Sequence, residues 1–171
     1  MKIFNIMLSR DLGGIQQVAV DYSESLKDNG AEVINISSIY AKINEIFKPT
    51  HRLLNMNPWC LLSRLYLWIL IHIHQPDIII VHGNRAINFT QSILSQLLNK
   101  KTPKIIGIAH NYKFKHLIKC DYIISLTTDL RKKLLEFGAK EDQLIDLPNM
   151  FKIKHPYRRQ NFAKKIRIGT I

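Results

Sequence analysis

Short apolar runs alternate with helical patterns along residues 1–150. The run Lys2–Leu8 is rich in Ile and Phe and ends at turn-forming residues, which is typical of a buried strand. The apolar residues that follow lie on one face of a helix, at Ile15, Val18, Ala19, Tyr22 and Leu26. Asn29-Gly30 then supplies the residue types of a helix C-terminus. The pattern therefore predicts a strand followed by a helix that ends near Gly30.

Five further apolar runs have the length of strands. They are Glu32–Ser37, Asp77–His82, Lys104–Ala109, Asp121–Leu126 and Gln143–Pro148. The run Asp77–His82 is continuously apolar, which is typical of a parallel strand covered on both faces. Helices are predicted over Ala86–Asn99 and Asp129–Gly138, the second capped by Thr127 or Thr128. This alternation predicts an α/β fold: a Rossmann-like open, mainly parallel sheet with helices on both faces.

The segment Ser38–Gln75 has the least regular pattern, apart from the mostly apolar run Trp59–His74. A membrane-spanning helix needs about 20 apolar residues, and this run is shorter and contains Arg64. We predict a helix that lies against the sheet. Its Trp and Tyr side chains either belong to the core or, with Arg64, face an anionic membrane surface.

The charge of the chain is strongly positive, with a formal net charge of +12 at pH 7. Basic residues gather in residues 100–120 and 151–171, which contain no acidic residue. This asymmetry indicates an anionic partner, either a phosphate-bearing ligand, an anionic membrane or nucleic acid. General basicity of the source proteome is the alternative. No nucleic-acid-binding motif is present, so nucleic acid is not an expected partner.

The last residues differ from the rest. Residues 151–165 are basic and lack a period, which predicts a linker, and residues 166–171 read "IRIGTI", the pattern of an opening strand. We therefore expect one Rossmann-like domain at 1–150, a basic linker at 151–165, and at 166–171 the first strand of another, C-terminal domain.

Candidate chemistry lies where strands end, because ligands of open parallel sheets bind outside the carboxyl ends of the strands. At Gly13-Gly14 a strand gives way to a helix, whose first N–H groups attract phosphate and whose glycines allow close approach. A plain turn is the alternative. There is no G-x-G-x-x-G motif, which disfavours NAD. The two cysteines have neither disulfide-framework nor zinc-ligand spacing, and no metal site is expected.

Two histidines also end strands. His110 can donate a hydrogen bond to a sugar hydroxyl or a phosphate, and a histidine there can titrate near neutrality. His82 ends the neighbouring strand and can line the same cleft with Asn84 and Arg85. For both histidines the alternative is an ordinary loop or packing role. Asp11 and Asp129 are interpreted as helix-capping or surface residues.

These features, taken in order, resemble the N-terminal half of GT-B glycosyltransferases of family 4, the retaining group 1 enzymes. The segments that carry the resemblance are "SRDLGGIQQVAVDYSESLKDNGAEV", "PDIIIVHGN", "PKIIGIAHN", "CDYIISLTTDLRKKLLEFGAKEDQLIDLPNMF" and "IRIGTI". Met150 departs from the family's pattern, which has glycine there. The family's donor-gripping basic pair and Glu-x7-Glu motif belong to the second domain, for which this chain has no sequence.

The resemblance implies a hexosyltransferase-type enzyme that uses a UDP- or GDP-sugar and no cofactor or metal. It implies that Gly13, Gly14 and Arg10 contact the donor diphosphate and that His110 is catalytic, near the transferred sugar. An acceptor pocket is expected from His82, Asn84, Arg85, Asn111 and Lys113.

The implied acceptor is a cell-envelope glycan or lipid, such as lipopolysaccharide or a glycolipid. The chain is then expected in the cytoplasm, at the inner face of the membrane, with a missing or separately encoded C-terminal domain as partner. Alone it is expected to be inactive. The alternative is a non-catalytic, basic module derived from such an enzyme, acting as a peripheral membrane or scaffold protein.

Overall fold

A computed structural model describes residues 1–54, 57, 59–95 and 102–148. The predicted linker at 151–165, the predicted strand at 166–171 and Met150 lie outside the described residues, as does the end of the helix predicted over Ala86–Asn99.

Within the described residues, seven strands form one sheet in the order β3-β2-β1-β4-β5-β6-β7. Their bounds are β1 (Lys2–Met7), β2 (Glu32–Ser38), β3 (His51–Leu53), β4 (Ile78–His82), β5 (Lys104–Ala109), β6 (Tyr122–Ser125) and β7 (Leu144–Asp146). Every neighbouring pair is parallel. The predicted Rossmann-like parallel sheet is therefore confirmed.

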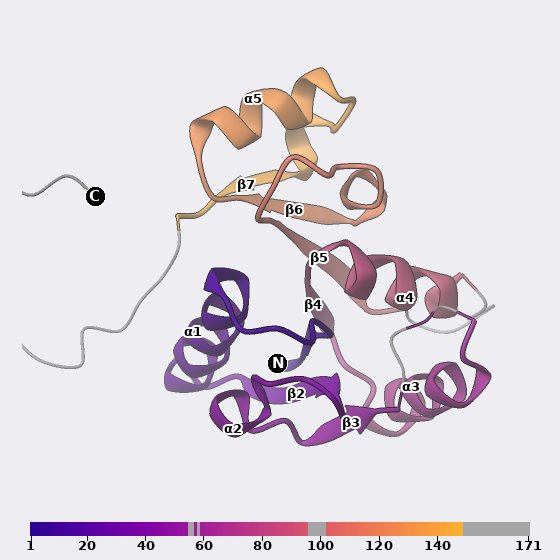
Figure 1. The fold of residues 1–171 in the computed structure, drawn as a ribbon. Coiled ribbons are helices and arrows are strands. Elements are labelled where there is room, and N and C mark those ends of the chain that lie inside the picture. The colour runs from indigo at the N-terminus through magenta and orange to yellow at the C-terminus, as the bar shows by residue number, and fades with distance from the viewer. Residues whose placement is uncertain (55–56, 58, 96–101, 149–171) are drawn as a thin grey trace, which may run out of the picture.

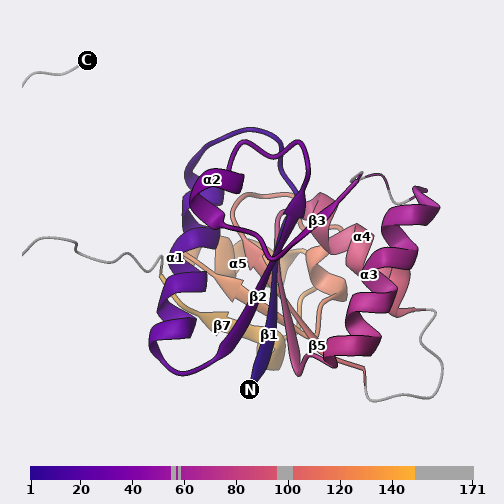
Figure 2. The ribbon, with the colours of Figure 1, turned by 90° about the horizontal axis from the view of Figure 1, so that it is seen from below.

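Helices cover both faces of the sheet. They are α1 (Gly14–Asp28), α2 (Asn44–Phe47), α3 (Leu61–His74), α4 (Asn84–Leu94) and α5 (Thr128–Glu136), with 3₁₀ turns at Leu117–Lys119 and Glu141–Gln143. Figures 1 and 2 show α1 and α2 on one side of the sheet and α3 and α4 on the other. Helix α5 joins the same hydrophobic core as α3 and α4. This two-sided arrangement also confirms the sequence-based prediction.

Two-sided packing explains why the strands are apolar at nearly every position. Along a strand successive side chains point to opposite faces. Ile3 packs with Val18 and Tyr22 of α1, whereas Phe4 belongs to the core formed with α3 and α4. Both layers exclude water from β1, so alternation of apolar and polar residues is absent.

The segment Ser38–Gln75 departs most from prediction, since it also contains α2 and β3. Helix α3 does lie against the sheet, through buried Leu67, Leu70 and Ile71. Its other side is exposed, so the alternative in which the Trp and Tyr side chains of this run belong to the core is wrong: Trp59 is 85% exposed, and Tyr66 and Trp68 are each 38% exposed. Among the described residues, no helix has both the length and the apolarity required to cross a bilayer.

Capping residues account for the start of α5 and for the ends of α1 and α5. The backbone N–H of Leu130 donates to Oγ1 of Thr127 at 3.2 Å, so Thr127 is the N-cap of α5. Gly30 and Gly138 follow α1 and α5 with φ of +80° and +106°, which glycine adopts without a Cβ clash.

Candidate functional site

The order of the strands reverses between β1 and β4, which lie side by side in the sheet. A cavity of about 270 Å³ lies at their carboxyl ends. It is lined by Met7, Leu8, Ser9, Asp11, Ile15, Gln16, His82, Gly83, Asn84, Arg85 and Ala86. In open α/β sheets this reversal point is the usual place of a ligand site. The cavity is therefore the candidate site.

Two helices from opposite faces of the sheet begin at this cavity. The N-cap residues are Gly13 for α1 and Gly83 for α4, and neither helix has a side-chain cap. Gly83 has φ +82°, a conformation that favours glycine. The first amides of a helix lack intrahelical acceptors and carry partial positive charge. Two helix N-termini thus lie at one cavity, although Gly13 and Gly14 themselves are not among its lining residues.

The glycines of the first loop are not explained by the packing of the chain itself. Gly13 has extended backbone that any residue adopts. A Cβ added at Gly14 would meet no atom within 4 Å, and one at Gly13 would meet only Gln16 Oε1, at 3.2 Å. Space therefore remains open beside the first turn of α1.

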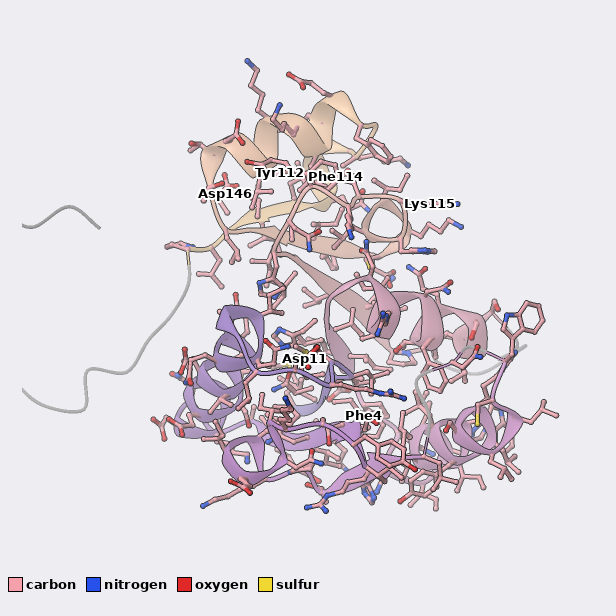
Figure 3. The ribbon with its side chains drawn as sticks, viewed as in Figure 1. Phe4, Asp11, Tyr112, Phe114, Lys115 and Asp146 are labelled. Carbon is pink, nitrogen blue, oxygen red and sulfur yellow. The ribbon has the colours of Figure 1, made fainter. Side chains whose placement is uncertain are left out.

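Charged side chains of both signs surround the cavity. Arg85 and Asp11 line it, and Asp11 lies between α1 and α4 in Figure 3. Asp11 Oδ1 is 4.0 Å from Lys42 Nζ. Because α1 has no side-chain cap, the capping role considered for Asp11 is wrong. Arg10 is not among the lining residues, and its guanidinium lies 5.6 Å from the centre of the Tyr40 ring.

A chain of buried polar side chains crosses the sheet beside the cavity. Asn35 of β2 donates to Phe47 O at 2.9 Å. Asn5 of β1 donates through Nδ2 to Ala19 O at 2.9 Å and to Asn35 Oδ1 at 3.3 Å. His82 Nε2 lies 2.8 Å from Asn5 Oδ1, and His110 Nε2 lies 3.4 Å from His82 Nδ1. The chain thus links β2 to the residue that follows β5.

These hydrogen bonds between side chains fix the tautomers of both histidines. Asn5 Nδ2 faces two oxygen acceptors, so Oδ1 faces His82 and accepts a hydrogen bond from its Nε2–H. Neutral His82 then has an unprotonated Nδ1, which accepts from Nε2–H of His110. His110 is left with a lone pair on Nδ1. Nδ1 can therefore accept a further hydrogen bond, although His110 is not among the residues that line the cavity.

Burial keeps both rings neutral. Desolvation lowers the pKa of His110 to about 4. Desolvation, and secondarily the charge of His110, lowers the pKa of His82 well below its ordinary value. The expectation that His110 titrates near neutrality is therefore wrong. At pH 7 it is an uncharged acceptor and not a donor of positive charge.

The remaining predicted residues lie on the loop after β5. Asn111 Oδ1 accepts a hydrogen bond from Lys113 N at 3.1 Å, and Tyr112 OH donates to Asp129 Oδ2 at 2.6 Å. Figure 3 shows Tyr112 beneath α5. The structure thus brings His82, Asn84 and Arg85 together, whereas Asn111 and Lys113 are not among the lining residues. Within the described ranges, no group of His, Cys, Asp or Glu side chains is arranged to hold a metal ion.

Three polar residues of this region, Asn5, Asn35 and Gln16, were not predicted as site residues. Asn5 and Asn35 are fully or almost fully buried, at 0% and 2% exposure. The sequence does contain a signal, since each of these asparagines lies between two isoleucines or between Phe and Ile within a strand. Buried amides need hydrogen-bond partners, so such residues indicate a polar network.

No family model matches the chain, and no curated protein matches its sequence. Solved structures do match. The lipopolysaccharide outer core galactosyltransferase WaaB aligns with a TM-score of 0.70 and 13% identity, over 94% of this chain and 50% of WaaB. HepE of Anabaena in complex with UDP aligns with a TM-score of 0.69 and 12% identity, over 88% and 44%. MnaA of S. aureus, also solved with UDP, aligns with a TM-score of 0.64 and 14% identity, over 85% of this chain and 43% of MnaA.

The chain has a GT-B-type Rossmann-like fold. It spans about half the length of the solved proteins that it matches. At 12–14% identity the similarity concerns the fold alone. What those proteins bind or transfer therefore bears on this chain only as a proposal.

Proposed function

We propose that the chain is the acceptor-side domain of a retaining, family 4 glycosyltransferase of hexosyltransferase type. It would move a sugar from a UDP- or GDP-sugar to a cell-envelope glycan or lipid, such as lipopolysaccharide or a glycolipid. It would act at the inner face of the membrane, together with a C-terminal domain that grips the other side of the donor.

One observation carries the proposal: two uncapped helix N-termini, those of α1 and α4, meet at one cavity at the strand-order reversal. Such an arrangement suits a diphosphate, because backbone N–H groups and helix dipoles favour negative charge. The open space at Gly14 would let a phosphate approach the backbone. The solved neighbours that hold UDP support this assignment.

The side chains then have distinct roles. Gly13 and Gly14 would contact the donor phosphates through their backbone. Arg10 would have to leave the Tyr40 ring to add charge there. His110 would accept a hydrogen bond from a sugar hydroxyl through Nδ1, held in that tautomer by His82. Retaining enzymes of this type use the donor phosphate as base, so the protein mainly positions and stabilises charge.

The acceptor would meet the other side of the cavity. Asn84 and Arg85 are the first two residues of α4 and line the cavity, so both can contact an anionic acceptor. Asn111 and Lys113 would join them through movement of the loop after β5. The isolated chain should give no turnover of a radiolabelled nucleotide-sugar, because sugar transfer needs both halves to hold the whole donor, even though this half alone can contact the diphosphate; robust turnover would exclude this part of the proposal.

The donor site can be tested by titrating UDP into the ¹⁵N-labelled chain and following amide resonances. We expect shifts at the first turns of α1 and α4, and none with uridine, which lacks phosphate. The variant Gly14→Ala should keep or slightly raise stability, since its Cβ has room and alanine favours helix. It should lose the UDP-dependent shifts. Equal shifts in the variant would identify Gly13-Gly14 as a plain turn.

The alternative function is a non-catalytic, basic membrane-peripheral or scaffold module. The exposed apolar side of α3 would give such a module a surface on which to dock. The chain would then dock on its target and show no UDP-dependent shifts at either helix N-terminus.

A further inference from the structure

The outer side of α3 is an apolar surface, here called the α3 arc. Its exposed residues are Leu61, Leu62, Leu65, Tyr66, Trp68, Ile69 and Ile73. At about 100° per residue they span roughly 160° of the helix. The buried residues of α3 occupy the opposite side, against the sheet. A surface helix ordinarily carries charged residues where this one carries Leu and Ile.

The α3 arc is exposed along its whole length, most strongly at its two ends and least at Tyr66, Trp68 and Ile69, which are 37–38% exposed. Leu61 is 78% exposed at the start of the helix and Ile73 is 70% exposed at its end. Trp59, in the turn before α3, adds an indole ring to the same end of the surface. Contiguous apolar surface of this kind marks a binding face for a protein or a membrane.

The surroundings of the α3 arc are basic and lack acids. Helix α3 contacts β3 and α4, and these three elements contain Arg52, Arg64 and Arg85 and no acidic residue. Arg64 Nη2 donates to Ser92 O at 3.2 Å, which holds it at the junction of α3 and α4. The wider stretch 46–120 has Asp77 as its single acidic residue. The lysines and arginines of the same stretch are Lys48, Arg52, Arg64, Arg85, Lys100, Lys101, Lys104, Lys113, Lys115 and Lys119.

We propose that the α3 arc docks on the surface of an anionic lipid bilayer. Charge complementarity selects this occupant, because lipid phosphates would face the arginine-bearing, acid-free rim. A second copy of the chain would instead bring two basic rims together without acids to pair them. At 14 residues the helix is about 21 Å long, against a hydrocarbon core of about 30 Å, so it would lie along the interface.

The aromatic residues fit this placement. Trp59, Tyr66 and Trp68 have an apolar ring with a polar N–H or O–H, a combination that suits the headgroup level of a bilayer. Tyr66 OH lies 3.0 Å from His51 Nδ1, so its hydroxyl end is at the β3 side of the arc. This inference is independent of sugar transfer, since it concerns a surface and not the cavity.

The chain provides its own reporter for the test, because its two tryptophans, Trp59 and Trp68, both belong to this surface. Mixing with vesicles of phosphatidylglycerol and phosphatidylcholine should shift tryptophan emission to the blue, and brominated lipids should quench it. Each arginine near an anionic surface strengthens binding roughly fivefold. Arg52 and Arg64 belong to elements beside the arc, whereas Arg85 lines the cavity, so partition into pure phosphatidylcholine vesicles should be weaker by roughly 25-fold.

A matched pair of double variants distinguishes vesicle binding through the α3 arc from non-specific adsorption through any exposed apolar residue. Leu62→Ser with Ile73→Ser alters the arc, and should weaken vesicle binding at least tenfold by removing inserted side chains. Ile46→Ser with Leu135→Ser alters exposed apolar residues of α2 and α5, and should bind as the unchanged chain does. Circular dichroism would verify that both variants are folded.

Three results would overturn the proposal. One is absence of emission shift and co-sedimentation with anionic vesicles at low salt. Another is equal weakening by the two double variants. The third is a dimer, detected by sedimentation velocity without lipid, that the Leu62→Ser, Ile73→Ser variant converts to monomer, since a second copy would then cover the arc.

Discussion

Acid should destabilise the fold through its buried histidines. His110 has a folded pKa of about 4, whereas the ordinary value is 6.5. As the pH falls, the unfolded chain therefore takes up a proton at this histidine before the folded chain does. Each further decrease in pH below 6.5 then favours unfolding. Stability from this group is complete above pH 6.5 and is lost progressively as the pH falls towards 4. His82 acts in the same direction, because burial lowers its pKa also.

The size of the effect follows from linkage. For a group with pKa values of 6.5 unfolded and about 4 folded, lowering the pH from 7.5 to 4.5 removes about 2.5 kcal/mol from the free energy of unfolding. Carboxylates also titrate in this range, so the difference between variants isolates His110. In His110→Gln the loss over the same range should be smaller by about 2.5 kcal/mol. His110→Phe, which also cannot titrate, should show the same reduced slope.

The assay is urea unfolding followed by circular dichroism at pH 7.5, 6.5, 5.5 and 4.5, with NMR titration of the histidine ring protons. Two outcomes would refute the reasoning. One is an NMR pKa above 6 for His110. The other is an equal acid-induced loss in the unchanged chain and both variants. The same NMR spectra report the tautomer, for which we expect protonation at Nε2 in both His82 and His110.

Three further substitutions test the packing, each by urea unfolding at pH 7.5. Asn5→Leu keeps the volume but leaves buried partners unpaired, and should cost about 3–5 kcal/mol; a loss below 1 kcal/mol would argue against an intact polar chain. Gly107→Ala should cost about 1–3 kcal/mol, because its Cβ would lie 2.8 Å from Leu117 Cδ2 and 2.9 Å from Cys120 Sγ. An unchanged unfolding midpoint would contradict that packing. Thr127→Ala should cost about 1 kcal/mol and Thr127→Ser much less, and equal losses would exclude a capping role.

The sheet and its longer helices could be predicted because each long element has a recognisable pattern of apolar residues. Continuous apolarity at Asp77–His82 and helical spacing from Ile15 to Leu26 each involve enough positions to reveal their type. The elements that were missed, β3 and α2, have only three and four residues. So few positions show no period, and tertiary contacts decide their conformation.

The positions of His82 and His110 at strand ends were predictable, but their protonation states were not. The rule for strand ends selected His82 and His110, and the structure places the two rings within hydrogen-bond distance. Their neutral state depends on burial and on Asn5, which comes from another strand. A sequence carries no direct measure of either. The cavity residues Asp11 and Gln16 were missed for a similar reason, because a loop's path decides which side chains line a cavity.

The buried amides of β1 and β2 also have a consequence for folding. Strands such as β4, with Ile at three successive positions, fit a sheet equally well when shifted by one residue, because both faces are apolar. Asn5 and Asn35 lie opposite each other in the register and bond directly. A one-residue slip of β1 would turn Asn5 towards the layer of α3 and α4, away from Ala19, Asn35 and His82. The pair therefore specifies which of several apolar alignments the chain adopts.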